Sequence, residues 1–266
     1  MRKGRSEKFL VQRIGHGDTS RFPDEVVVEE PLEIRLDGNL VGTTMRTPGH
    51  DYELAVGFCV AENLLQDAPV TGVRYCGEGP AAEHEYNVVT VETGGQAPIP
   101  EPRIGNVSSS CGLCGSVALE ELAALMSPME HSVSFDVRAI RRVLAAVSEQ
   151  QEMFARTGGL HAAAAFDSEG MIELLREDIG RHNAVDKVIG SRFLGGNRNA
   201  QQLGLFVSGR ASFEMVQKAW SGGFGTLIAV SAPSALAVEL AKVANMTLVG
   251  FARNDSMNLY AGQIDE

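Results

Sequence analysis

Cysteine is scarce in this chain of 266 residues, which contains only four. Four cysteines are too few to build a disulfide scaffold in a chain of this length. The core therefore has to form by apolar packing. Apolar residues make up 44% of the sequence and charged residues 21%, an ordinary globular composition. The length predicts one large domain or two modest ones.

Long apolar runs are also missing. No stretch of about eighteen consecutive apolar residues occurs, which predicts no membrane span. The first ten residues, MRKGRSEKFL, lack the apolar stretch of a signal peptide. We therefore expect a cytoplasmic protein, and in that compartment a close cysteine pair is more often reactive or metal-binding than structural.

Positive charge is the minority sign. The net charge of −11 argues against nucleic acid or an anionic membrane as a partner, because both need a basic surface. Three nucleotide-related motifs are absent: a GxGxxG turn after a strand, a Walker lysine loop and the zinc-deaminase pattern. These absences leave a dinucleotide oxidoreductase, a P-loop protein and a zinc deaminase unsupported.

Hydrophobic periodicity predicts a mixture of strands and helices. Strands are expected in a hairpin over 26–46, at 70–76 and 85–93, in a pair around a turn at 168–170, and at 203–208, 226–232 and 247–253. Helices are expected within 47–65, after 116, over 136–154, and at 183–194, 212–220 and 233–244. The alternation of strands and helices after residue 203 predicts an α/β fold with a mostly parallel sheet covered on both faces.

A glycine- and proline-rich stretch at 94–103 is the best domain boundary. We expect a flexible N-terminus over 1–22 and a smaller α+β subdomain over 23–104. An α/β domain over 105–266 then carries the cysteine pair.

Cys111 and Cys114 form the first candidate site. They are separated by two residues, preceded by three serines and followed by glycine, as in an accessible loop. A helix expected just beyond them and the close pairing both favour a thiolate, which is the attacking species in sulfur chemistry. A structural zinc site would need four ligands, and Cys59 lies in an apolar helical pattern where a buried, inert thiol is expected. Sulfur transfer and redox exchange therefore both remain open at this point.

Two further candidate sites are polar segments near expected helix starts. The first contains His161 and a later cluster that includes Asp178, Arg181, His182 and Asn183, a good place to hold an anion. The alternative is a pair of ordinary histidines beside a solvated charge cluster.

The second segment follows a strand that ends near Ser208 and includes Arg210 and Ser212, which suit a phosphate. Arg253 ends the last expected strand. Loops at the carboxyl ends of strands bind ligands in open α/β folds. Convergence of Arg181, Arg210 and Arg253 on one sheet edge predicts a phosphate-bearing ligand, whereas arginines paired with nearby carboxylates would be the alternative.

Eight motifs, taken together and in order, resemble the FdhD/NarQ family. They are EEPLEIRLDG (29–38), RTPGHDYELAVGF (46–58), SSSCGLCG (108–115), RTGGLHAAA (156–164), EDIGRHNAVDKVIG (177–190), VSGRASFEMVQKA (207–219), SAPSALAVELA (231–241) and TLVGFAR (247–253). The resemblance runs from about residue 25 to residue 253, so it is far more specific than any one motif.

The resemblance implies a sulfurtransferase, or sulfur carrier, that is needed for formate dehydrogenase activity. Such a protein accepts sulfur from a cysteine desulfurase as a persulfide, which would form on Cys111, with Cys114 as an accessory thiol. It passes the sulfur to the molybdenum of the bis(molybdopterin guanine dinucleotide) cofactor before the cofactor enters apo formate dehydrogenase. A guanine nucleotide would mimic this bound substrate.

The resemblance also implies a cytidine-deaminase-like three-layer sandwich without the deaminase metal site, and a homodimer. The cofactor-contacting segment of the family corresponds to Phe251, Ala252, Arg253, Asn254, Asp255 and Ser256. With the residues singled out above, the expected cofactor-binding set adds Arg181, His182, Ser208 and Arg210. A cofactor chaperone that forms no covalent persulfide is the alternative function, and a small zinc or redox protein is a third.

Overall fold

The computed structural model describes residues 4–14, 19–76, 86–99, 126–130, 134–197 and 200–265. The strands are β1 (Ser6–Ile14), β2 (Thr19–Val27), β3 (Glu30–Leu36), β4 (Asn39–Arg46), β5 (Gly72–Tyr75), β6 (Val88–Glu92), β7 (His161–Phe166), β8 (Ile172–Asp178), β9 (Gly204–Val207), β10 (Thr226–Ala229), β11 (Thr247–Gly250) and β12 (Asn258–Ala261). The helices are α1 (Asp51–Ala61), α3 (Val137–Gln150), α4 (Glu152–Thr157), α5 (Arg181–Leu194), α6 (Phe213–Ser221) and α7 (Ala235–Val243).

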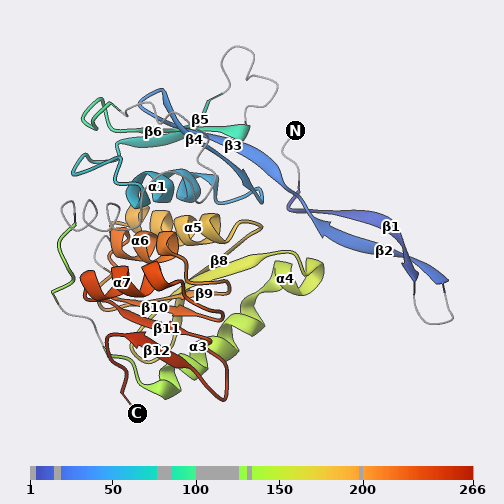
Figure 1. The fold of residues 1–266 in the computed structure, drawn as a ribbon. Coiled ribbons are helices and arrows are strands. Elements are labelled where there is room, and N and C mark those ends of the chain that lie inside the picture. Colours follow the sequence, from blue (N-terminus) through green and yellow to red (C-terminus); the bar gives the residue numbers. More distant parts are fainter. Residues whose placement is uncertain are drawn as a thin grey trace.

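Two sheets enclose helices between them (Figure 1). The smaller sheet has the order β4-β3-β6-β5, and helix α1 covers it. The larger sheet has the order β12-β11-β10-β9-β7-β8. Helix α5 packs between α1 and the larger sheet, so the helical layer joins the two parts of the molecule.

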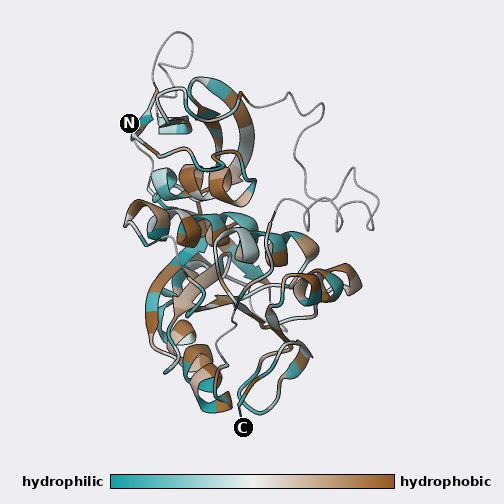
Figure 2. Cartoon of the chain, turned by 90° about the vertical axis from the view of Figure 1, so that its left-hand side faces the viewer, coloured by the Kyte–Doolittle hydropathy of each residue, from teal (hydrophilic) through white to brown (hydrophobic). Residues whose placement is uncertain are grey.

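The larger sheet is covered on both faces because its central strands are almost wholly apolar. On one face, Ala163, Leu205 and Leu227 pack in the cluster that contains buried residues of α5, α6 and α7. On the other face, Ala164 and Phe206 pack in the cluster that contains the apolar side of α3. Figure 2 shows the stacked arrangement from a second side, with hydrophobic and hydrophilic residues alternating around the helices.

Two glycines let α1 and α5 touch through their backbones. A Cβ atom added to Gly57 would lie 1.8 Å from the carbonyl oxygen of Asp186, and one added to Gly190 would lie 1.8 Å from that of Glu53. Any larger residue would force the helices apart. This crossing therefore sets the position of α5, whose first residues border the site described below.

Most of the elements predicted from periodicity are confirmed. The 26–46 hairpin appears as β3–β4, the turn at 168–170 joins β7 to β8, and the later strands and helices alternate as expected. The helix expected over 136–154 is divided into α3 and α4, and Asp136 caps α3 because its side chain accepts a hydrogen bond from the backbone N–H of Arg138. The helix expected after residue 116 lies outside the described residues.

Two expectations about the fold are wrong. The larger sheet is mixed rather than mostly parallel: β9, β10 and β11 run parallel, whereas β7–β8, β7–β9 and β11–β12 are antiparallel pairs. The tight turn between β7 and β8 forces these two strands to run antiparallel. Strand β12, which was not predicted, adds the antiparallel pair β11–β12. In addition, the segment 1–22, expected to be flexible, contains β1 and the first part of β2, which form an antiparallel hairpin.

None of the helices in the described part of the chain is long and apolar enough to span a bilayer.

Candidate functional site

One edge of the larger sheet gathers the segments singled out from the sequence. The parallel strands β9, β10 and β11 all end there. Because β7 is antiparallel to both β8 and β9, its first residue, His161, lies at the same edge as Asp178, which ends β8. The backbone N–H of Ser208 bonds to the carbonyl of Ala162 at 3.0 Å, which joins the β7 and β9 ends. We call this region the ligand edge.

Ser208 links β9 to His161 through its side chain. Its hydroxyl oxygen accepts a hydrogen bond from the backbone N–H of Ala162 at 2.9 Å and lies 3.3 Å from His161 Nδ1. Gly209 follows, and a Cβ atom there would lie 3.3 Å from Arg181 Cδ and 3.7 Å from His161 Nδ1. The glycine therefore lets the histidine and the arginine approach the end of β9 closely.

Helix α5 begins at the ligand edge with two basic residues, Arg181 and His182. Arg181 is half-buried, and its Nε atom is sheltered from solvent without a hydrogen-bond partner among the described residues. His182 forms an ion pair with Glu214 on α6, with Nε2 and Oε2 2.7 Å apart. The bond to His182 lowers the pKa of Glu214. Arg181 therefore keeps one sheltered donor, Nε, available to a ligand, while its charge also acts on Glu214.

His161 lies beside these two basic side chains. Burial lowers its pKa, and the charges of Arg181 and His182 lower it further, whereas Asp178 acts in the opposite direction. The imidazole of His161 is consequently neutral near pH 7.

Asp178 and Asn183 do not face a ligand, in contrast to the expectation that they help to hold an anion. Asp178 is fully buried and accepts hydrogen bonds from Lys187 Nζ at 2.6 Å and from the Thr47 N–H at 3.1 Å. Asn183 donates to Asp178 at 2.9 Å and to the Met45 carbonyl at 2.7 Å. Both side chains instead tie the ligand edge to the end of β4 and to Thr47, which follows it.

The other predicted contacts lie on exposed loops of the same edge. Arg210 follows β9 and is exposed. The segment from Phe251 to Ser256 follows β11, where the backbone N–H of Phe251 bonds to the carbonyl of Ser231 and that of Ala252 to the carbonyl of Ala229. Apart from the buried Ala252, the segment is exposed and turns where the Arg253 N–H bonds to the Ser256 carbonyl at 2.9 Å.

The cysteine pair, Cys111 and Cys114, lies outside the described residues. Cys59 is fully buried, as predicted, and burial together with nearby Asp186 and Glu62 raises the pKa of its thiol to about 12. Such a thiol is inert.

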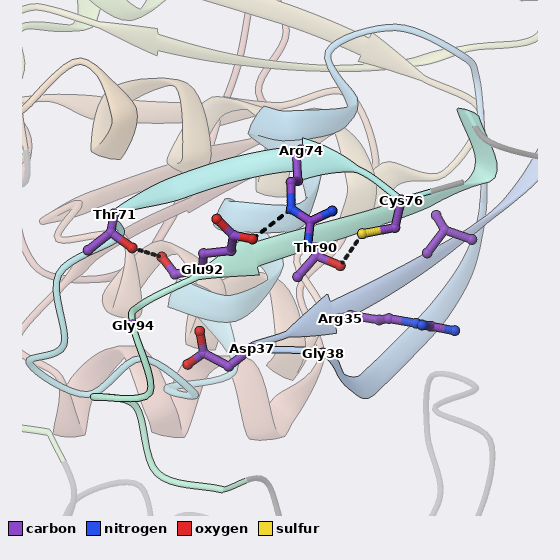
Figure 3. Close-up of a pocket in the computed structure, with 10 residues that line it drawn as sticks. Arg35, Asp37, Gly38, Thr71, Arg74, Cys76, Thr90, Glu92 and Gly94 are labelled. Atoms are coloured by element: carbon purple, nitrogen blue, oxygen red, sulfur yellow. Dashed lines mark hydrogen bonds and ion pairs between the residues drawn. The ribbon is translucent and has the colours of Figure 1, made fainter. Parts of the chain in front are cut away.

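Cys76 borders a cavity of about 450 Å³ on the smaller sheet (Figure 3). Its sulfur lies 3.0 Å from Thr90 Oγ1. Across the portion of the chain with assigned positions, histidines, cysteines and carboxylates do not cluster as metal ligands would.

Sequence reasoning missed one residue at the ligand edge. Glu214 escapes notice because it reads as an ordinary first-turn acid of α6, and its partner His182 is far away in sequence. Ser212, which the sequence offers as a phosphate partner, lies just before α6 and has a sheltered hydroxyl without a partner among the described residues. A serine at a helix start is expected to cap the helix, but here the side chain makes no capping bond.

These features describe an α/β protein with a candidate ligand site, rich in basic side chains, at the carboxyl ends of its parallel strands. The sequence profile of the FdhD/NarQ family matches residues 27–264. The chain belongs to this family.

Known relatives match almost the whole chain. The sulfur carrier protein FdhD of Streptomyces avermitilis is 45% identical over 269 residues, which cover 97% of this chain and 94% of the relative. The protein of the same name from Nocardia farcinica is 45% identical over 256 residues, which cover 95% and 91%.

A crystal structure from Desulfotalea psychrophila, described as a formate dehydrogenase accessory protein, has a similar fold. The TM-score is 0.80 at 23% identity, and the match covers 98% of this chain and 100% of that one.

Proposed function

We propose that this chain is a sulfur carrier of the sulfurtransferase type that serves formate dehydrogenase. It takes persulfide sulfur from a cysteine desulfurase and passes it to the molybdenum of the bis(molybdopterin guanine dinucleotide) cofactor. The observation that carries the proposal is the similarity over nearly the full length to proteins named sulfur carriers. The cationic ligand edge supports it because the cofactor is rich in phosphate.

The first step is a thiol exchange at Cys111. Its thiolate attacks the outer sulfur of the desulfurase persulfide, a new sulfur–sulfur bond forms, and the desulfurase cysteine leaves as a thiolate. Cys111 then carries the persulfide, and Cys114 serves as an accessory thiol.

The ligand edge holds the cofactor as a substrate in this proposal. Arg181, Arg210 and Arg253 provide cationic donors to its phosphates, with Ser208 and His182 beside them. The segment Phe251–Ser256 contacts the guanine end. Binding metal and sulfur on one protein supplies the proximity that a bimolecular encounter lacks.

Intact-protein mass spectrometry tests the carrier function. The chain is incubated with a cysteine desulfurase, cysteine and pyridoxal phosphate, in parallel with Cys111→Ala and Cys114→Ala. We expect a mass increase of one sulfur, about 32 Da, because the Cys111 thiolate is the acceptor. The adduct should disappear on reduction and be absent from Cys111→Ala.

Cys59→Ala is the matched control, since its buried thiol cannot be reached. If no variant gains sulfur while the natural chain still binds a guanine nucleotide, the carrier proposal is wrong and the chain is a cofactor chaperone.

The fold, the location, the assembly and the acceptor complete the proposal. The mixed sheet with helices on both faces supports a cytidine-deaminase-like sandwich, and the smaller sheet with α1 supports a subdomain over 23–104. We further propose a cytoplasmic location and a homodimer, for which light scattering should give twice the chain mass of 28.5 kDa. The apo formate dehydrogenase is the acceptor of the loaded cofactor.

A further inference from the structure

His161 is the half-buried titratable group at the ligand edge to which the function above assigns no task. We propose that His161 binds the diphosphate of the guanine dinucleotide and takes up one proton from solvent as the diphosphate arrives. The inference rests on the proposed function, because it deepens the description of the same ligand edge. It makes cofactor capture dependent on pH through one identified residue.

The position of His161 is set by rigid elements on both sides. It begins β7 and pairs with Asp178 of β8, and its ring lies 3.3 Å from the Ser208 hydroxyl at the end of β9. Gly209 and Arg181 complete the surroundings, with the sheltered Arg181 Nε still lacking a partner in the described part of the chain. An anion that bonds to Arg181 would therefore lie beside the imidazole.

The groups around His161 explain why its imidazole is neutral before the diphosphate arrives. Helix α5 contributes Arg181 and His182, and both lower the pKa of His161 in addition to the effect of burial. Strand β8 contributes only Asp178, which is already bonded to Lys187. From α6, Glu214 is held by His182. A diphosphate brings negative charge to this position, so its arrival reverses the balance and favours the imidazolium.

The bond between His161 and Ser208 can change direction when the proton arrives. The Ser208 oxygen already accepts from the Ala162 N–H, so its own hydrogen is free to be donated. In the neutral state it donates to His161 Nδ1, and Nε2 carries the ring hydrogen. After one solvent proton binds Nδ1, this nitrogen donates to Ser208, whose hydroxyl hydrogen is released for the ligand. Each proton remains accounted for, and the ligand gains a charged donor.

The sign of the pH dependence follows from linkage. Diphosphate binding raises the pKa of His161, so the bound state holds more protons than the free state between the two pKa values. The affinity is greatest below the free-state pKa, falls as the pH rises through the bound-state pKa, and is constant above it. Loss of one charge-assisted hydrogen bond should weaken binding about tenfold to a hundredfold.

GDP-mannose is the probe of choice for calorimetry. Both of its phosphates are diesters, as in the dinucleotide, so the probe exchanges no proton near neutral pH. Titrations at several pH values, each in two buffers of different ionisation enthalpy, measure the protons taken up on binding. We expect uptake of up to one proton by the natural chain, and none by His161→Gln, whose affinity should be low and independent of pH.

His50→Asn is the matched control. Like His161, which lies near Asp178, His50 lies near a carboxylate, that of Glu53. It precedes α1 at a left-handed backbone position, which asparagine tolerates. This variant should keep the proton uptake. If His161→Gln still takes up a proton, or the natural chain binds the probe without any uptake, the inference is wrong while the proposed function stands. If no variant binds the probe at any pH, the inference and the cofactor-binding part of the proposed function both fail, whereas persulfide formation on Cys111 is measured separately.

Discussion

Buried ion pairs occupy several charged side chains, which are then not available to bind a ligand. On α5, Lys187 pairs with Asp178 at 2.6 Å, and the adjacent Asp186 pairs with Lys218 at 2.8 Å. All four side chains are buried. Removal of one partner from such a pair costs about 3–5 kcal/mol, since the other charge is left uncompensated. These residues therefore support the ligand edge from behind and are poor choices for probing it.

Glu53 makes the stability of the chain sensitive to acid. Burial alone would raise its pKa, but bonds to Arg176 (2.5 and 2.8 Å) and to His50 lower it to about 2 from the usual 4.5. The depressed pKa contributes stability above pH 4.5 that is lost as the pH falls towards 2. We expect Glu53→Gln to remove about 2–3 kcal/mol of this dependence.

Urea unfolding between pH 2 and 7 measures the effect. Glu173→Gln is the control, because Glu173 also pairs with an arginine, Arg192, but at a more exposed position. The explanation fails if both variants lose the same share of the pH dependence.

The contact between α1 and α5 is the element-scale feature on which the site depends. Both helices carry a glycine at the crossing. Because no side chain separates them there, the two helix backbones come into direct contact. Because α5 begins at Arg181, any displacement of the helix moves the arginine and His182 relative to β7 and β9.

Gly57→Ala should therefore be strongly destabilising. The added methyl group would lie 1.8 Å from the Asp186 carbonyl oxygen, so the helices must separate at a cost of about 3 kcal/mol or more. Thermal unfolding by circular dichroism measures this loss. Gly38→Asn is the control, since the turn there leaves open space and asparagine tolerates its positive φ. Equal melting temperatures for Gly57→Ala and the natural chain would show that the helices adjust without cost.

At the scale of the whole molecule, the β1–β2 hairpin extends away from the two sheets (Figure 1). Its apolar side chains Phe9, Leu10 and Ile14 are 51%, 71% and 84% exposed. It is joined to the body at its base, where Glu25 pairs with Arg156 of α4. The rest of the fold should therefore be independent of the hairpin tip.

Replacing residues 10–23 with Asn-Gly tests this independence. Phe9 and Asp24 are direct partners across the hairpin, so a two-residue turn can join them. We expect the melting temperature to change by less than about 4 °C, the effect of about 1 kcal/mol in a chain of this size. Calorimetry at several protein concentrations provides the measurement. A larger loss, dependent on concentration, would show that the tip is buried in an assembly.

Local patterns were sufficient to predict most elements and the loops of the ligand edge. The apolar runs at 203–208, 226–232 and 247–253 predicted β9, β10 and β11, and strand ends that share a direction had to place Ser208, Arg210 and Arg253 on one edge. The candidate thiols Cys111 and Cys114 also come from sequence, since they lie outside the described residues. The sequence of hairpin β1–β2 gave no comparable hydrophobic pattern. Neither face of the hairpin is buried, so an alternation of apolar and polar residues is not required there.

Only the tertiary structure distinguished the polar residues that remain candidates for ligand binding from those that support the fold. Asp178 and Arg181 are close in sequence and both polar, yet Asp178 is buried by Lys187 and by Thr47, which is 131 residues away. The pairing of His182 with Glu214, and the approach of His161 to Ser208 and Arg181, are likewise contacts between distant segments. Periodicity reports which side of an element is buried, but the partner of a buried charge depends on how the elements pack.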